Sequence, residues 1–226
     1  MLCTQCSKPI KPVVACDIDG TLGDYHGHFV EFASKYLGRR LPSVQNYLSN
    51  RRFAEYLGIS LPEYRTIKLA YRQGGMKRSM PIFLGAGALL RTIHEQGCEL
   101  WLTTTRPYLR LDNIDPDTRF WLERHGITYD GLLYDEDKYE RLAENVDRQR
   151  VILVIDDLPD QLTAASTYFG HDRVALAANG HNAWISRSIR YSHRQLERMV
   201  ENRVGEWKRR HAHEALVQAL DASPEV

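Results

Sequence analysis

The chain has 226 residues, of which 43% are hydrophobic and 26% are charged, and its formal net charge is +1 at pH 7. These proportions are typical of a globular protein with a buried core, and they exclude both a disordered chain and the strong basic excess of a protein that coats nucleic acid. No apolar run has the length of a membrane span, and the first residues lack the apolar stretch of a signal peptide. We therefore expect a cytoplasmic protein without membrane partners.

Residues 1–11 are expected to form an N-terminal tail with a CxxC pair, Cys3 and Cys6. The pair could be half of a zinc site that is completed by His211, His213 or a second chain, because structural zinc takes four ligands. The alternative is two free thiols at a frayed terminus. Both interpretations stay open at the level of sequence.

Three apolar runs each end abruptly in polar residues. Residues 12–16 lead into Asp17-Ile18-Asp19-Gly20-Thr21, residues 100–103 into Thr104-Thr105-Arg106-Pro107, and residues 151–155 into Asp156-Asp157. Continuous apolar runs of this length predict strands that are buried on both faces, as in a parallel sheet. The polar clusters would then follow the carboxyl ends of their strands.

Helical patterns lie between these strands, over residues 88–96, 117–125 and 159–168, and a glycine follows each one where a helix C-cap is expected. The alternation of strand and helix predicts an α/β fold. We expect a Rossmann-like core domain over residues 12–23 and 85–191, with a parallel sheet and helices on both faces. Ligands of such folds bind at the carboxyl ends of the strands.

Two segments depart from this alternation. Residues 24–84 are rich in Tyr, Arg, Leu and Phe at helical spacing, which predicts a helical insert that could fold over the strand ends as a cap. Residues 192–226 predict a C-terminal helical extension, in which alternating basic and acidic side chains favour a solvated helix over a nucleic-acid-binding stripe. This extension and the CxxC pair are the candidate contacts of a homodimer.

Asp17 and Asp19 are the first candidate catalytic or metal-binding residues. In an extended backbone, residues two apart project to the same side, and two close carboxylates repel each other unless a cation or a shared proton intervenes. Mg²⁺ meets this need, since it binds a few carboxylates together with water and substrate phosphate. Asp156 and Asp157, at the end of another strand, could supply further ligands.

If the substrate is a phosphate monoester, its non-bridging oxygens need binding partners as well as the metal ion. Hydroxyl groups and lysines provide such partners. Thr104 at the end of its strand and Lys138 after an acidic loop are the candidates. For Thr104 the alternative is a hydroxyl that bonds its own backbone. For Lys138 the alternative is an ordinary surface lysine.

These residues occur in the order of four motifs of a known family. Asp17 to Thr21 reads DxDGT, an apolar strand ends in Thr104, Lys138 supplies a lysine, and Ile155-Asp156-Asp157 supplies an acidic pair. Over roughly residues 12–180 the chain thus resembles the haloacid dehalogenase (HAD) superfamily of phosphatases.

The resemblance implies a mechanism. Asp17 would attack phosphorus and form an aspartyl-phosphate, while Asp19 would protonate the leaving oxygen and then activate water. Mg²⁺ would be held by Asp17, the backbone carbonyl of Asp19, and Asp156, with Asp157 binding the ion or a bound water.

Within the superfamily, residues 17–29 resemble the opening of the 5′(3′)-deoxyribonucleotidases, and residues 178–182 resemble a His-Asn segment of that subfamily. Two positions depart from its pattern. The second motif continues as Thr-Thr-Arg-Pro instead of Thr-Ser-Pro, and His26 stands where an acidic residue is usual.

This resemblance implies a nucleoside monophosphate as substrate. The candidate substrate contacts are Thr21, Tyr25, His26, Phe29, Thr105 and Arg106. For the aromatic residues the alternative is the core of the helical insert, and for Arg106 it is a role in holding its loop. Two other functions remain open: a phosphatase acting on 3′ or 5′ ends of nucleic acids, and a non-catalytic regulatory module that binds a metal or a phosphate.

Overall fold

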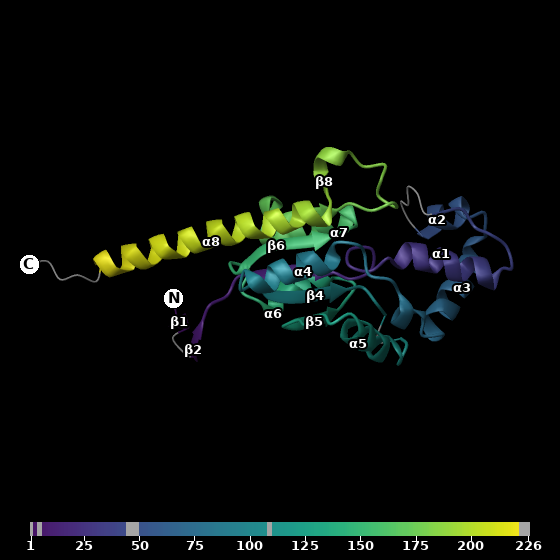
Figure 1. Ribbon diagram of the computed structural model, residues 1–226, viewed down its shortest axis with the longest axis horizontal. Coiled ribbons are helices and arrows are strands. Elements are labelled where there is room, and N and C mark those ends of the chain that lie inside the picture. Colours follow the sequence, from purple (N-terminus) through teal and green to yellow (C-terminus); the bar gives the residue numbers. More distant parts are fainter. Residues whose placement is uncertain (1, 4–5, 44–49, 108–109, 222–226) are drawn as a thin grey trace, which may run out of the picture.

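The computed structural model describes residues 2–3, 6–43, 50–107 and 110–221 (Figure 1). In this part of the chain, six parallel strands form one sheet in the order β5-β4-β3-β6-β7-β8. The strands are β3 (Val13–Asp17), β4 (Glu99–Thr104), β5 (Gly131–Tyr134), β6 (Val151–Asp156), β7 (Val174–Ala177) and β8 (Arg190–Tyr191). The parallel α/β fold predicted from the sequence is confirmed.

The register of the central strands brings their polar ends together. Asp17 at the end of β3 lies opposite Thr103 of β4, and on the other side Cys16 lies opposite Ile155 of β6. β3 and β6 are fully buried, as their continuous apolar runs predict. The carboxylates that follow these two strands therefore meet at one edge of the sheet.

Helices cover both faces of the sheet. Helices α4 (Ala86–Glu95) and α8 (His193–Asp221) pack together on one face, where they share a core with Val14 and Leu153. Helices α6 (Lys138–Asn145) and α7 (Pro159–Phe169) pack on the other face against Ala15 and Val154. Helix α5 (Ile114–Arg124) adds its buried residue Trp121 to the first of these cores.

A helical segment separates β3 from α4. It contains α1 (Tyr25–Tyr36), α2 (Asn50–Tyr56), α3 (Leu61–Gln73) and the 3₁₀ turn η1 (Met76–Ser79). Asp24 is the N-cap of helix α1, and its side chain accepts a hydrogen bond from the Gly27 N–H at 2.9 Å. We call this segment the helical insert. It lies beyond the carboxyl ends of the strands, at the opposite end of the molecule from both chain termini (Figure 1).

The core of the helical insert is aromatic. The ring of Phe29 is fully buried and lies with its centroid 5.4 Å from that of Tyr64 and 5.6 Å from that of Tyr71, both in edge-to-face geometry. Phe53 of α2 joins the same cluster. Phe29 therefore packs inside the insert, which was the alternative to its predicted contact with substrate.

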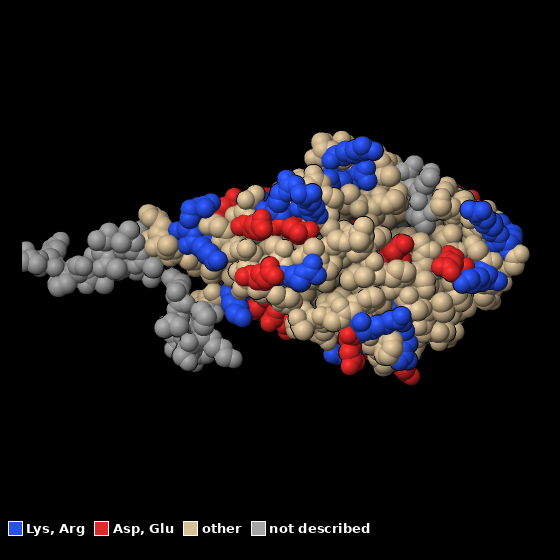
Figure 2. All heavy atoms as spheres, in the orientation of Figure 1, with Lys and Arg blue, Asp and Glu red and all other residues tan. Residues whose placement is uncertain are grey.

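Helix α8 is a single helix, with Leu196, Val200 and Val204 buried against the core. Its second half runs past the sheet, at the end of the molecule where the N-terminal hairpin also lies (Figure 1). Acidic and basic side chains are interspersed over it (Figure 2). No single-sign stripe follows the visible face of the described part of α8, as expected for a solvated helix.

The N-terminal hairpin consists of β1 (Leu2–Cys3) and β2 (Cys6–Pro9), with Cys3 opposite Cys6 in an antiparallel register. The side chains of these cysteines lie outside the described residues, so the zinc hypothesis stays a prediction. None of the helices within the described ranges combines the length and the hydrophobicity that crossing a bilayer requires.

Candidate active site

Three carboxylates meet where β3 and β6 end. The side chains of Asp17, Asp156 and Asp157 are buried, and their ligand atoms lie within 4.8 Å of one another. Lys138, the first residue of α6, places its Nζ 2.5 Å from Asp17 Oδ1 and 2.7 Å from Asp156 Oδ2. It is fully buried, so it is not an ordinary surface lysine.

The charges of this cluster do not balance. Burial raises the pKa of Asp17 and of Asp156, although Lys138 acts in the opposite direction on both. For Lys138 itself, burial opposes the charged form, but Asp156 and Asp17 hold its pKa above the ordinary value. One ammonium group cannot neutralise three buried carboxylates. A divalent cation would supply the missing charge, and an all-oxygen donor set is the kind that Mg²⁺ prefers.

The loop after β3 leaves room for the third carboxylate. Gly20 has φ +98°, and a Cβ at this position would lie 2.3 Å from Asp157 Oδ2. A side chain here would therefore displace the carboxylate. Asp157 Oδ1 also accepts a hydrogen bond from the Thr21 hydroxyl at 3.1 Å, so the DxDGT loop and the end of β6 are fitted to each other.

Asp19 faces two cations from distant parts of the chain. Arg106 donates from Nε to Asp19 Oδ2 at 3.1 Å and from a terminal nitrogen to Oδ1 at 2.6 Å, and Lys77 of η1 pairs with Oδ2. Burial favours the protonated carboxyl group, yet Arg106 and Lys77 hold the pKa of Asp19 well below its usual range. Asp19 is thus a carboxylate in this arrangement.

No known family model matches the sequence. Over 154 residues, 66% of this chain and 71% of the other protein, the chain is 25% identical to a curated protein of Chlorobaculum tepidum that is named "Putative 5′(3′)-deoxyribonucleotidase".

Two solved structures share the fold at low sequence identity. A "putative beta-phosphoglucomutase" from Thermotoga maritima has a TM-score of 0.54 at 16% identity, covering 85% of this chain and 99% of its own. A HAD-superfamily hydrolase of subfamily IA, variant 1, from Geobacter sulfurreducens PCA has a TM-score of 0.50 at 16% identity, covering 84% of this chain and 97% of its own. The chain has the HAD fold.

Within this HAD fold, the residues that support the cluster were not all evident from the sequence. Tyr139 donates its hydroxyl hydrogen to Asp156 Oδ2 at 2.6 Å. Thr104, predicted to hold phosphate, accepts a hydrogen bond from the Arg106 N–H at 3.3 Å, which is the bond to its own backbone that was the alternative. Its phosphate-binding role stays a prediction.

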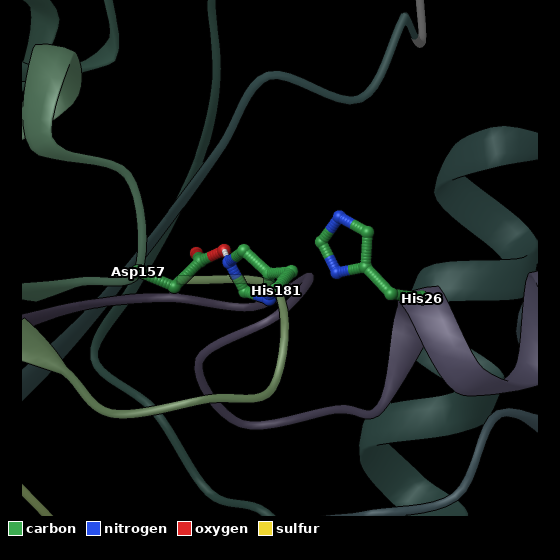
Figure 3. A group of neighbouring side chains, drawn as sticks. All are labelled: His26, Asp157 and His181. Atoms are coloured by element: carbon green, nitrogen blue, oxygen red, sulfur yellow. Dashed lines mark ion pairs between the residues drawn. The ribbon is translucent and has the colours of Figure 1, made fainter. Parts of the chain in front are cut away.

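A second cluster joins the helical insert to the HAD core (Figure 3). His181, in the loop after β7, places Nε2 2.7 Å from Asp157 Oδ2, while His26 of α1 stacks on the His181 ring at a centroid distance of 4.1 Å. Burial, followed by the proximity of His181, lowers the pKa of His26 to about 3. His26 is therefore neutral at physiological pH, which suits a ring packed in an interior position.

The loop that carries His181 is itself held by amide groups. Asn182 donates to the backbone carbonyls of Asp157 and Ala177 at 3.0 and 2.8 Å, and Asn179 donates to the carbonyl of Gly20. This is the segment whose His-Asn sequence resembled the deoxyribonucleotidases. Its amides fix the loop relative to the buried carboxylates at the strand ends.

A cavity of about 180 Å³ opens beside Asp19 and Asp157, between the helical insert and the ends of the strands. Four predicted substrate contacts line it: Tyr25, His26, Thr105 and Arg106. Thr21 and Phe29 are fully buried and do not line it. Lys77 also lines the cavity, and no sequence motif predicts it. Two further lining residues, Lys68 and Arg72, are four residues apart on α3, a spacing that places them on one helix face.

Proposed function

We propose that the chain is a Mg²⁺-dependent phosphomonoester hydrolase that acts through an aspartyl-phosphate on Asp17. The observation that carries the proposal is the pairing of Asp17 with Lys138 beside two further carboxylates, next to a cavity lined by cations. A buried carboxylate whose counter-charges are fixed is suited to nucleophilic attack on a phosphate group. The shared HAD fold supports the same chemistry.

In the first step, a carboxylate oxygen of Asp17 attacks phosphorus while the bond from phosphorus to the ester oxygen breaks. Asp19 gives a proton to the departing oxygen, so that an alcohol leaves. Asp19 is ionised while Lys77 and Arg106 hold it. The phosphate of a bound substrate competes for these two cations, and their transfer to phosphate would raise the pKa of Asp19 toward the range of a general acid.

In the second step, water attacks phosphorus of the aspartyl-phosphate and the Asp17–phosphorus linkage breaks. Asp19, now a carboxylate, takes the proton from this water, and inorganic phosphate and the Asp17 carboxylate are restored. Lys138 remains beside Asp17 and stabilises its charge in the free enzyme.

Asp17, Asp156 and Asp157 would hold Mg²⁺ together with the backbone carbonyl of Asp19. The ion would neutralise charge on the phosphate oxygens during transfer. His181 and Thr21 orient Asp157 for this purpose through its two carboxylate oxygens.

The helical insert would serve as a cap over the cavity, because Tyr25 and His26 from α1 and Lys77 from η1 form part of the lining. For the substrate we propose a nucleoside monophosphate. The support is the similarity to the Chlorobaculum protein named for deoxyribonucleotides, together with the aromatic ring of Tyr25 in the cavity wall.

The experiment that tests this function is phosphate release from a panel of ribo- and deoxyribonucleoside 5′-monophosphates and sugar phosphates, with Mg²⁺ or with EDTA. We expect turnover of a nucleotide that needs Mg²⁺ and that disappears in Asp17→Asn. Turnover of sugar phosphates alone would reject a nucleotide as the substrate but would still support phosphomonoester hydrolysis. No turnover of any compound by correctly folded protein would favour a binding module.

A further inference from the structure

Three cations of α3, which have no role in the mechanism proposed above, lie on one helix face. Arg65, Lys68 and Arg72 follow the spacing i, i+3, i+7, which places their side chains along a single stripe. Lys68 and Arg72 line the inner cavity beside Asp19. Together with Arg65 they also line a second, outer cavity of about 740 Å³. The two cavities share Thr105 and Pro107 as well, so the stripe runs from the inner cavity to the outer one.

The outer cavity carries an excess of positive charge. Its charged lining residues are Arg65, Lys68, Arg72, Arg110 and Glu136. Glu136 lies 3.3 Å from Arg110, so the single acid of this lining pairs with the arginine that is not on α3. The stripe on α3 therefore faces the cavity as a set of cations.

The transferred phosphate does not need this stripe. Lys138 lies at Asp17, and Lys77 and Arg106 lie at Asp19, which leaves three cations and the proposed metal ion for one phosphate group. The α3 stripe continues from the inner cavity, where Asp19 would protonate the leaving oxygen, into the outer cavity. Burial and the neighbouring Arg72 lower the pKa of Lys68 to about 8, although Asp19 acts in the opposite direction.

We propose that the α3 stripe is a subsite for a second phosphate group, carried by the leaving group of the substrate. This proposal rests on the proposed phosphatase function, and it extends the substrate from a nucleoside monophosphate to a phosphate monoester whose leaving group carries a further phosphate. Two sources share this chemistry: a small bisphosphate, such as a nucleoside 3′,5′-bisphosphate, and the phosphodiester next to the terminal phosphate of a nucleic-acid strand. Guanidinium groups bind phosphate oxygens through paired hydrogen bonds, which explains the use of arginine at two of the three positions.

Binding to the Asp17→Asn protein tests the subsite without dependence on turnover. The probes are 2′-deoxyadenosine 5′-monophosphate, 2′-deoxyadenosine 3′,5′-bisphosphate and the 5′-phosphorylated dinucleotide d(pApA), titrated calorimetrically with Mg²⁺ at low salt. We expect the Kd of the bisphosphate to be lower than that of the monophosphate by about tenfold or more, the size expected for one or two hydrogen bonds between charged groups. If the dinucleotide binds at least as tightly as the bisphosphate, the second phosphate is the phosphodiester of a nucleic-acid strand. If only the bisphosphate binds more tightly than the monophosphate, the second phosphate belongs to a small molecule.

The stripe is then removed in the same background. Arg65→Gln combined with Arg72→Gln should bring the Kd values of the monophosphate and the bisphosphate to within about twofold of each other. The change keeps the Arg72 carbonyl that accepts a hydrogen bond from Asn113, and the thermal midpoint serves as the folding control. The matched control is Arg91→Gln, an exposed arginine on α4 that lines neither cavity and should leave the preference intact.

Equal affinity of the Asp17→Asn protein for the three probes would overturn the subsite, whatever the result of the turnover assay. The same conclusion follows if Arg91→Gln lowers the preference as much as the double variant does, since the effect would then be general electrostatics. If the wild-type protein released no phosphate but bound the bisphosphate more tightly than the monophosphate, the subsite would stand and the phosphatase reaction would be rejected.

Discussion

Arg106 holds Asp19 through two separate hydrogen bonds, at 3.1 Å from Nε and 2.6 Å from a terminal nitrogen, and its other terminal nitrogen donates to the Thr118 hydroxyl at 2.7 Å. The guanidinium is buried and fixed in its plane between the DxDGT loop and α5. Arg106 thus holds its loop and reaches the cavity at once, so both interpretations of this residue from the sequence have a structural basis. No other side-chain type offers this planar set of donors.

Arg106→Lys should lower kcat/KM by about a hundredfold. The single ammonium group of lysine cannot reproduce the two hydrogen bonds that the Arg106 guanidinium donates to the Asp19 carboxylate. The measurement is steady-state phosphate release with the best substrate of the panel. Arg78→Lys is the matched control, since Arg78 is half exposed, contacts Asp117 at 3.8 Å and the Phe120 ring at 4.0 Å, and does not line the cavity. Similar kinetic losses in the two variants would argue against a specific role for the guanidinium of Arg106.

Gly20→Ala should destabilise the protein more than Gly97→Ala, although both glycines have positive φ. At Gly97, φ is +77° and no atom lies within 4 Å of the added Cβ, so only backbone strain of about 1 kcal/mol is expected. At Gly20 the Cβ also meets Asp157, which should add about 1–3 kcal/mol of overpacking. Urea unfolding measures both free energies. Equal decreases in the free energy of unfolding of the two variants would show that the DxDGT loop can move to accept a Cβ at residue 20 without a loss of stability.

Lys138→Met should lower the free energy of unfolding by about 3 kcal/mol or more in EDTA, because it leaves Asp17 and Asp156 buried without their shared cation. Mg²⁺ should restore part of this loss by supplying positive charge to the same carboxylates. Lys11→Met, at an exposed position, should change stability by less than about 0.5 kcal/mol. Failure of Mg²⁺ to stabilise either the wild type or Lys138→Met would count against a metal site at these aspartates.

His26 should make stability fall in mild acid. Its pKa is lowered to about 3 in the folded protein, whereas an unfolded histidine titrates near 6.5. Between these values the unfolded chain binds the additional proton, so the free energy of unfolding decreases as pH falls below about 6.5, by at most about 1.4 kcal/mol per pH unit. In EDTA, lowering the pH from 7 to 5 should therefore decrease the free energy of unfolding of the wild type more than that of His26→Leu. A difference that is independent of pH would show that His26 keeps its ordinary titration.

The carboxylate cluster was predictable from the sequence for a simple reason. Asp17, Asp156 and Asp157 each follow a continuous apolar strand, and in a parallel sheet the carboxyl ends of neighbouring strands lie at one edge. The glycines after α4, α5 and α7 likewise marked the ends of these helices, since positive φ favours glycine there.

The sequence by itself therefore determined the α/β architecture and the carboxylates at the carboxyl ends of its strands, because strand burial and helix capping are local properties that leave a local pattern. Only the tertiary structure decided which cations meet Asp19, that His26 stacks on His181, and that the α3 stripe borders the cavity. Lys77 and Arg106 lie 58 and 87 residues from Asp19 along the chain. Such contacts depend on how the helical insert packs over the strand ends, and packing between distant segments leaves no periodicity in the sequence.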